Sequence, residues 1–163
     1  MTKTKAQQIM AATEVRAAND VTAAIQDIAA EFEPYIIKQR RHFHKHPELS
    51  LAEERTTSDI ANQLDAMNIP YERPLKTGLV ATLRGTAPDA YREDGTPRRR
   101  ILLRADIDAL PVTEQTGEEF ASVNEGCMHA CGHDCHIAMM LGTLQILRHM
   151  TDDIHGEVRI VFQ

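Results

Sequence analysis

Six cysteine and histidine side chains fall within ten consecutive residues: Cys127, His129, Cys131, His133, Cys135 and His136. Thiolates and imidazoles are the ligands that zinc and related metals select. On a strand the odd-numbered members project to one side, and on a helix residues three or four apart share a face. Almost any backbone therefore brings two or three of them together. Ordinary core packing explains single cysteines and histidines well but six in ten residues poorly, so the cluster predicts a metal site.

The spacing of the cluster excludes several familiar kinds of site. Ala130 follows His129, so the H-E-x-x-H motif of helix-borne zinc proteases is absent. There is no C-x-x-C pair, which argues against zinc ribbons and fingers. There is also no P-loop and no G-x-S-x-G motif. A redox pair formed by Cys131 and Cys135 stays open as an alternative.

Two carboxylates, Asp106 and Asp108, directly follow the apolar residues 101–103. In open α/β sheets, ligands bind beyond the carboxyl ends of the strands, and carboxylates orient the histidines that ligate metals. The competing interpretation is a turn, because aspartate bonds nearby backbone amides. The pair alone slightly favours the turn. Together with the cysteine and histidine cluster, it favours a catalytic metal that polarises a carbonyl and activates water.

The elements that must position these residues alternate between helix and strand. Hydrophobic periodicity predicts strands over 78–83, 101–103 and 158–162 and helices over 51–67 and 132–150. Ser50 and Glu53 match a capping box for the first of these helices. Residues 86–99 are a polar loop. This order predicts an α/β fold with a largely buried sheet.

An N-terminal helical extension is predicted over residues 1–33, followed by a partial catalytic domain over 34–163. Val21, Ile25, Ile28 and Phe32 recur at helical spacing, which predicts an amphipathic helix packed on the body. The first ~18 residues have a weaker pattern and are expected to fray. Pro34 suits the first turn of a new helix that runs to about residue 46.

The composition is that of a soluble globular protein of 163 residues, with 42% hydrophobic residues and a net charge of −6. The acidic balance argues against a nucleic-acid partner, and the basic run 98–100 is interpreted as solvated charge. No apolar run reaches the ~18 residues of a membrane helix. The absence of an apolar leader makes a cytoplasmic location the expectation.

At these motifs the sequence resembles the metal-dependent amidohydrolases and peptidases of the aminoacylase/carboxypeptidase superfamily. The most similar branch holds indoleacetyl-amino-acid hydrolases, hippurate hydrolases and N-acyl-amino-acid deacylases. The matching stretches follow the family order over about residues 36–163, and they are RRHFHKHPELS (40–50), TGLVA (77–81), LRADIDALP (103–111), GCMHACGHDCH (126–136) and GEVRIVFQ (156–163). The resemblance implies the N-terminal part of a three-layer α/β/α catalytic domain, truncated before the remaining strands and the lid or dimerisation domain.

Carried over residue by residue, the resemblance implies that Cys131 and His133 ligate a site of two divalent ions. These ions would be zinc or manganese, with cobalt and nickel as alternatives. Asp108 would not bind the ions itself but would orient the residues that do. The resemblance and the cluster together assign pocket roles to Asp106, His129, Asp134 and His136. The signature residues His44, His46, Pro47 and Glu48 are interpreted as structural.

The reaction implied is hydrolysis of the amide bond of a small-molecule N-acyl amino acid. Cys135 departs from the family, which usually has a small residue there. The family continues after its Phe-Gln strand with Pro-Ala-Glu-Glu, which supplies the general base, whereas this sequence ends at Gln163. We therefore expect an incomplete portion that binds metal weakly and has little or no activity. The alternative is a non-catalytic metal-binding or partner-binding remnant. The oligomeric state stays open, and a homo-oligomer is compatible with the complete enzyme.

Overall fold

The computed structural model describes the backbone of residues 5–163 and the side chains of residues 20–163. Its elements are α1 (Lys5–Lys45), α2 (Glu54–Ala66), β1 (Tyr71–Glu72), β2 (Leu79–Arg84), β3 (Arg100–Ala105), α3 (His133–Arg148), the short 3-10 helix η1 (Thr151–Asp153) and β4 (Glu157–Phe162). The predicted mixed α/β class and the three longer strands are confirmed. The sequence patterns missed β1 and η1.

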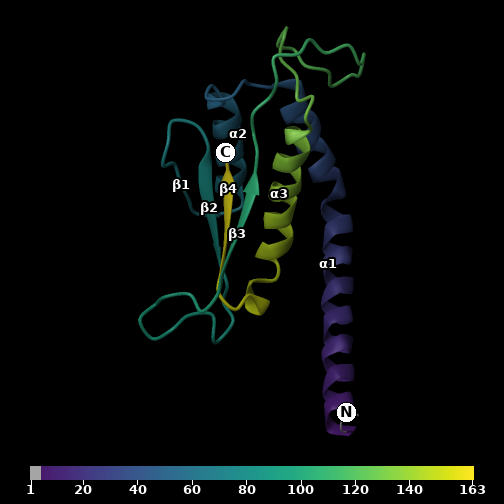
Figure 1. Ribbon diagram of the computed structural model, residues 1–163, viewed down its shortest axis with the longest axis vertical. Helices are drawn as coiled ribbons and strands as arrows, with labels where there is room; N and C mark the ends of the chain where they lie inside the picture. Colours follow the sequence, from purple (N-terminus) through teal and green to yellow (C-terminus); the bar gives the residue numbers. More distant parts are fainter. Residues whose placement is uncertain (1–4) are drawn as a thin grey trace.

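The strands form one sheet in the order β1-β2-β4-β3 (Figure 1). β4 runs antiparallel to β2 and parallel to β3, and Ile160 pairs with Ala81 on one side and with Leu103 on the other. The carboxyl ends of β3 and β4 therefore meet at the same edge of the sheet. Since ligands bind at such edges, this arrangement places the residues after β3 where a site is expected.

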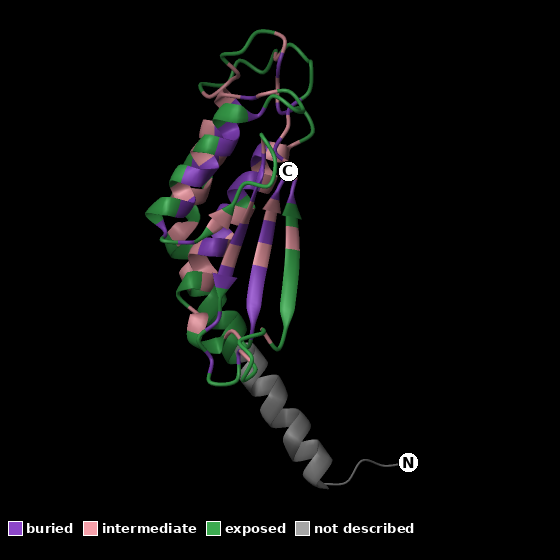
Figure 2. Ribbon diagram, turned by 90° about the vertical axis from the view of Figure 1, so that its left-hand side faces the viewer, coloured by how far each residue is buried: buried purple, intermediate pink, exposed green. Residues whose placement is uncertain are grey.

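The helices of the described chain cover one face of this sheet (Figure 2). Alternate residues of β2 and β4 on that face are buried and join residues of α2 and α3 in one hydrophobic core. The opposite face stays partly open: the side chain of Leu102 is 61% exposed on β3. The prediction of a largely buried sheet was therefore wrong for this face, because no described helix packs against it.

α1 is one continuous helix, so the predicted start of a new helix at Pro34 was wrong. A proline inside a helix removes one backbone hydrogen bond. Packing against α3 compensates for this loss on both sides of Pro34. The ring centroid of Phe32 lies 5.4 Å from that of His149. Ile36 packs closely against Gly142, because a Cβ atom added to this glycine would lie 2.6 Å from Cδ1 of Ile36. The division into domains at residue 33 stays a prediction.

The N-terminal half of α1 extends past the end of α3 (Figure 1). The prediction that its apolar stripe is packed was therefore only half right. Ile28 and Phe32 are partly buried, but Val21 and Ile25 are 45% and 38% exposed. The first ~18 residues were expected to fray, but the backbone is helical from Lys5 onward; residues 1–4 lie outside the described part of the chain. None of the described helices is long and apolar enough to cross a membrane.

The start of α2 differs from the predicted capping box. Leu51 adopts a left-handed conformation, with φ of 66°, and the helix begins only at Glu54. Its free amides are satisfied from outside by Glu48, whose carboxylate accepts hydrogen bonds from the backbone of Arg55 at 3.2 Å and of Thr56 at 2.7 Å. Glu48 therefore caps α2, and Glu48 is one of the signature residues that were interpreted as structural.

Candidate metal centre

Backbone hydrogen bonds bring the cysteine and histidine cluster back to the carboxyl end of β3. Leu110 and Met128 exchange two backbone hydrogen bonds, of 2.9 and 3.0 Å, which hold the start of the cluster beside the segment that follows β3. Gly132 then adopts a left-handed conformation, with φ of 84°, at the N-cap of α3. A glycine takes this conformation without strain, so the chain turns sharply and His133 becomes the first residue of the helix.

Asp106, His133 and His136 converge at this edge of the sheet. Each offers one ligand atom, and these atoms all lie within 4.8 Å of one another. Nδ1 of His136 is 3.6 Å from Oδ2 of Asp106, and the two imidazoles stack with their centroids 5.1 Å apart. Within the described side chains, no other three acidic, histidine or cysteine residues place one ligand atom each within this distance of both others. We call these three residues the triad.

Asp108 fixes the imidazole of His133. Nδ1 of His133 lies 2.8 Å from Oδ1 of Asp108 and 2.9 Å from the Asp108 carbonyl oxygen. Because both of these atoms are acceptors, Nδ1 donates the proton, and Nε2 is the nitrogen that faces away from Asp108. A carboxylate behind a histidine is the usual way in which proteins orient a metal ligand.

The three cysteines lie outside the triad, and all three are free. Cys131, which the resemblance assigns as a ligand, is exposed. Cys135 is partly buried, and Cys127 is buried. Burial, and secondarily the charge of Glu48, raises the pKa of the Cys127 thiol. The structure therefore brings His133 together with the predicted pocket residues Asp106 and His136, rather than with Cys131.

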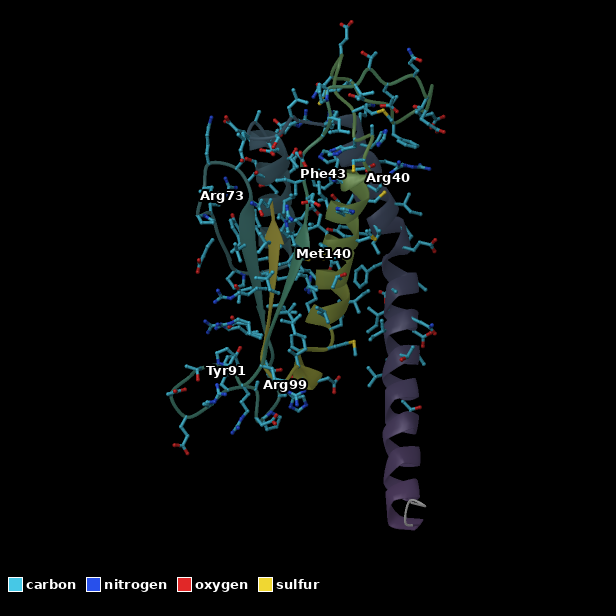
Figure 3. All side chains as sticks on the ribbon, viewed as in Figure 1. Arg40, Phe43, Arg73, Tyr91, Arg99 and Met140 are labelled. Carbon is cyan, nitrogen blue, oxygen red and sulfur yellow. The ribbon has the colours of Figure 1, made fainter. Side chains whose placement is uncertain are left out.

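A second polar group lies beside the cluster and is largely buried. Oδ2 of Asp134 accepts hydrogen bonds from Nδ1 of His44 and Nε of Arg40, each at 2.8 Å. Nε2 of His44 lies 3.0 Å from Oε1 of Glu114. Figure 3 shows Arg40 on the part of α1 that lies beside the start of α3, at the opposite end of the sheet from Arg99 of the basic run. The sequence patterns did not single out Glu114, because one glutamate in a polar segment carries no signal of its own.

His129 lies in the same region and is only 3% exposed, and neither of its ring nitrogens has a hydrogen-bond partner. Burial lowers its pKa to about 4, although the charge of Asp134 opposes this effect. Oδ1 of Asp134 is also unpartnered. A pocket of about 460 Å³ adjoins both residues, and Cys131 and Cys135 also line it. The predicted pocket residues His129 and Asp134 thus face this space.

Known proteins are similar to this chain in sequence. Residues 102–163 match the model of peptidase family M20/M25/M40. An N-acyl-L-amino acid amidohydrolase of Geobacillus stearothermophilus is 44% identical over 140 residues, which are 85% of this chain and 35% of the relative. An N-acetylcysteine deacetylase of Bacillus subtilis is 43% identical over 137 residues, which are 81% of this chain and 33% of the relative.

A solved structure is similar to this chain in both fold and sequence. A dinuclear metal binding peptidase of the M20 family from Bacillus subtilis superposes with a TM-score of 0.73 and 42% identity, over 82% of this chain and 36% of that one. The chain spans about a third of the length of the relatives that it matches. The motifs and the fold are thus similar to those of members of peptidase family M20/M25/M40, whose model matches residues 102–163.

Proposed function

We propose that this chain provides part of a divalent-metal centre that hydrolyses the amide bond of N-acyl amino acids. The observation that carries the proposal is the convergence of Asp106, His133 and His136, with Asp108 hydrogen-bonded behind His133. The names of the relatives supply the substrate class: one is an N-acyl-L-amino acid amidohydrolase and another an N-acetylcysteine deacetylase. The related solved structure binds two metals by its description.

The donor set suits such an ion. Two imidazoles and one carboxylate are ligands that zinc accepts, and they also suit manganese. His133 would hold the ion through the nitrogen that faces away from Asp108, with Asp106 and His136 beside it. Following the resemblance, we propose Cys131 as a further ligand of a two-ion site. When bound, a divalent ion supplies a Lewis acid that polarises the carbonyl and acidifies water.

The residues of this chain serve mainly to hold and orient. Asp108 keeps the His133 ring in one tautomer, and the carboxylates of Asp106, in the triad, and of Asp108, behind it, are already engaged. Asp106 pairs with Arg104 at 2.7 Å, and Asp108 pairs with His133 at 2.8 Å. Among the described side chains, neither of these carboxylates is free to act as a general base. We therefore expect the 163 residues alone to bind metal weakly and to turn over substrate slowly or not at all.

A chimera tests the proposed function directly. The 137-residue stretch of the Bacillus subtilis deacetylase that matches this chain would be replaced by the corresponding residues of this chain. We expect the zinc- or manganese-loaded chimera to release free amine from N-acetylcysteine, and His133→Ala to abolish this release. The isolated chain would serve as a second sample, with turnover expected near background. A chimera that folds and binds metal but releases no amine would contradict the proposal.

A further inference from the structure

His44 of α1 lies between two carboxylates that come from distant parts of the chain. Its side chain is 6% exposed, and its ring nitrogens lie 2.8 Å from Asp134 Oδ2 and 3.0 Å from Glu114 Oε1. The side chains of these two carboxylates are themselves only 1% and 4% exposed. Partners in this position hold the ring in one orientation, because a rotation of the imidazole would leave a buried carboxylate without its donor.

Glu114 organises the segment between β3 and the cysteine and histidine cluster. Its carboxylate accepts hydrogen bonds from the backbone of Ser122 at 2.6 Å and from the hydroxyl of Thr116 at 2.5 Å. The ring of Phe120, in the same segment, packs edge-on against His44 with centroids 5.5 Å apart and also lies under Arg40. We call residues 112–126 the strap. It is docked onto the C-terminal part of α1 through Glu114 and Phe120.

Asp134 links His44 to the first turn of α3. It belongs to the first turn of α3, directly after His133 and two residues before His136. Arg40 and His44 both donate to its Oδ2, whereas Asp108 holds the neighbouring His133 from the β3 side. The first turn of α3, which carries two of the triad residues, is therefore held from α1 and from β3.

We propose that His44 is a positioning residue, which transmits the placement of the strap through Asp134 to the first turn of α3 and so sets where His133 and His136 stand. The part of this role that concerns metal binding by His133 and His136 rests on the proposed metal centre. Without His44, Asp134 and Glu114 would be buried with one donor fewer each, and the first turn of α3 would lose part of its anchor. Partners that orient metal ligands typically change affinity by about 10–100-fold when they are removed.

The experiment compares His44→Ala with a matched control, His42→Ala. His42 lies two residues away on α1 and also makes a 2.8 Å contact with an aspartate, Asp59. This contact is 38% and 27% exposed, and Asp59 belongs to α2 rather than to α3. Zinc affinity would be measured by titration against a chromogenic chelator. Hydrogen exchange of residues 133–137 would be measured without metal. We expect His44→Ala to lose at least about 10-fold in zinc affinity and to exchange at least about 10-fold faster in this turn, with changes below about 2-fold for His42→Ala.

Two additions keep the test decisive. His44→Gln retains a donor for Asp134, so it should recover part of both losses and serves if His44→Ala does not fold. Added imidazole should likewise restore affinity to His44→Ala. Unchanged zinc affinity and unchanged exchange in a folded His44→Ala or His44→Gln chain would overturn the proposal. If the unmodified chain binds no zinc, the metal centre fails on its own account, and the exchange of residues 133–137 alone decides whether His44 positions this turn.

Discussion

The imidazole of His133 donates from Nδ1 to Oδ1 of Asp108 across 2.8 Å, and these two residues lie 25 positions apart in the chain. Asp108 follows β3 and His133 begins α3, so one hydrogen bond joins the two elements that form the candidate centre. Its geometry leaves Nε2 of His133 available. This is the arrangement by which a carboxylate orients a histidine for a metal ion.

Replacing Asp108 with alanine should weaken metal binding. The His133 ring would lose its side-chain acceptor and with it part of its fixed orientation, so zinc affinity should fall by about 10–100-fold. Titration with a chromogenic chelator would measure the change. Asp94→Ala provides the control, because Asp94 is an exposed residue of the polar loop that bonds only within its own turn. Equal zinc affinities for the two variants would argue against the role of Asp108.

Glu48 should contribute measurably to stability as the cap of α2. Glu48→Ala removes the acceptor of the Arg55 and Thr56 amides, and the loss of a helix cap costs about 0.5–2 kcal/mol. Urea denaturation would report this as a lower free energy of unfolding. The control is Glu54→Ala, which removes an ion pair with Lys76 that is 61% and 76% exposed and should cost no more than about 0.5 kcal/mol. A larger loss for the control would contradict the assigned cap.

The strap should make stability depend on pH through Glu114. Burial alone would raise the pKa of Glu114, but hydrogen bonds from Ser122, Thr116 and His44 outweigh it and lower the pKa from 4.5 to about 2. Between these values the unfolded chain binds a proton that the folded chain does not, so this stabilisation is complete above pH 4.5 and is lost as the pH falls toward 2. It amounts to about 3 kcal/mol.

Glu114→Gln removes this titration and serves as the comparison. The difference in free energy of unfolding between the unmodified chain and Glu114→Gln should be constant above about pH 5 and should shrink toward pH 2. Denaturant titrations at several pH values would measure it. A difference that grows as the solution becomes more acidic would show that the sign is wrong.

The role of Cys131 can be read from its reactivity. Cys131 is exposed and Cys127 is buried with a raised pKa, so a thiol reagent should modify Cys131 first. If Cys131 is a ligand, zinc should slow this modification several-fold, and His133→Ala should remove the protection. Protection of all three cysteines by one tightly bound zinc would instead favour the non-catalytic metal-binding alternative. Rapid loss of the Cys131 and Cys135 thiols to a mild oxidant would favour the redox pair.

The parts of the fold that follow local patterns could be predicted from the sequence. β2, β3, β4 and α3 were expected within a few residues, because their apolar residues recur with the period of a strand or a helix. Pro34 was misread because packing of Phe32 and Ile36 on α3 outweighs its local preference. The cap of α2 was missed because the turn at Leu51 passes the capping role to Glu48.

The candidate site was predictable in its residue types but not in its partners. The motifs pointed to His133 and Asp108, which the structure joins. They could not reveal that Asp134 is bonded to His44, because 90 positions separate these residues. They also did not show that Asp106 and His136, rather than Cys131, converge on His133, because that depends on how the chain turns at Gly132.

Zinc stoichiometry and affinity show whether the first turn of α3 carries a metal centre. The chain, His133→Ala and His136→Ala would each be dialysed against zinc over a range of concentrations, and the bound metal would be measured by elemental analysis. We expect at least one zinc per unmodified chain, loss of this zinc in His133→Ala, and binding at least about 10-fold weaker in His136→Ala. Zinc bound equally well by all three proteins, or by none of them, would contradict a metal centre built on the first turn of α3.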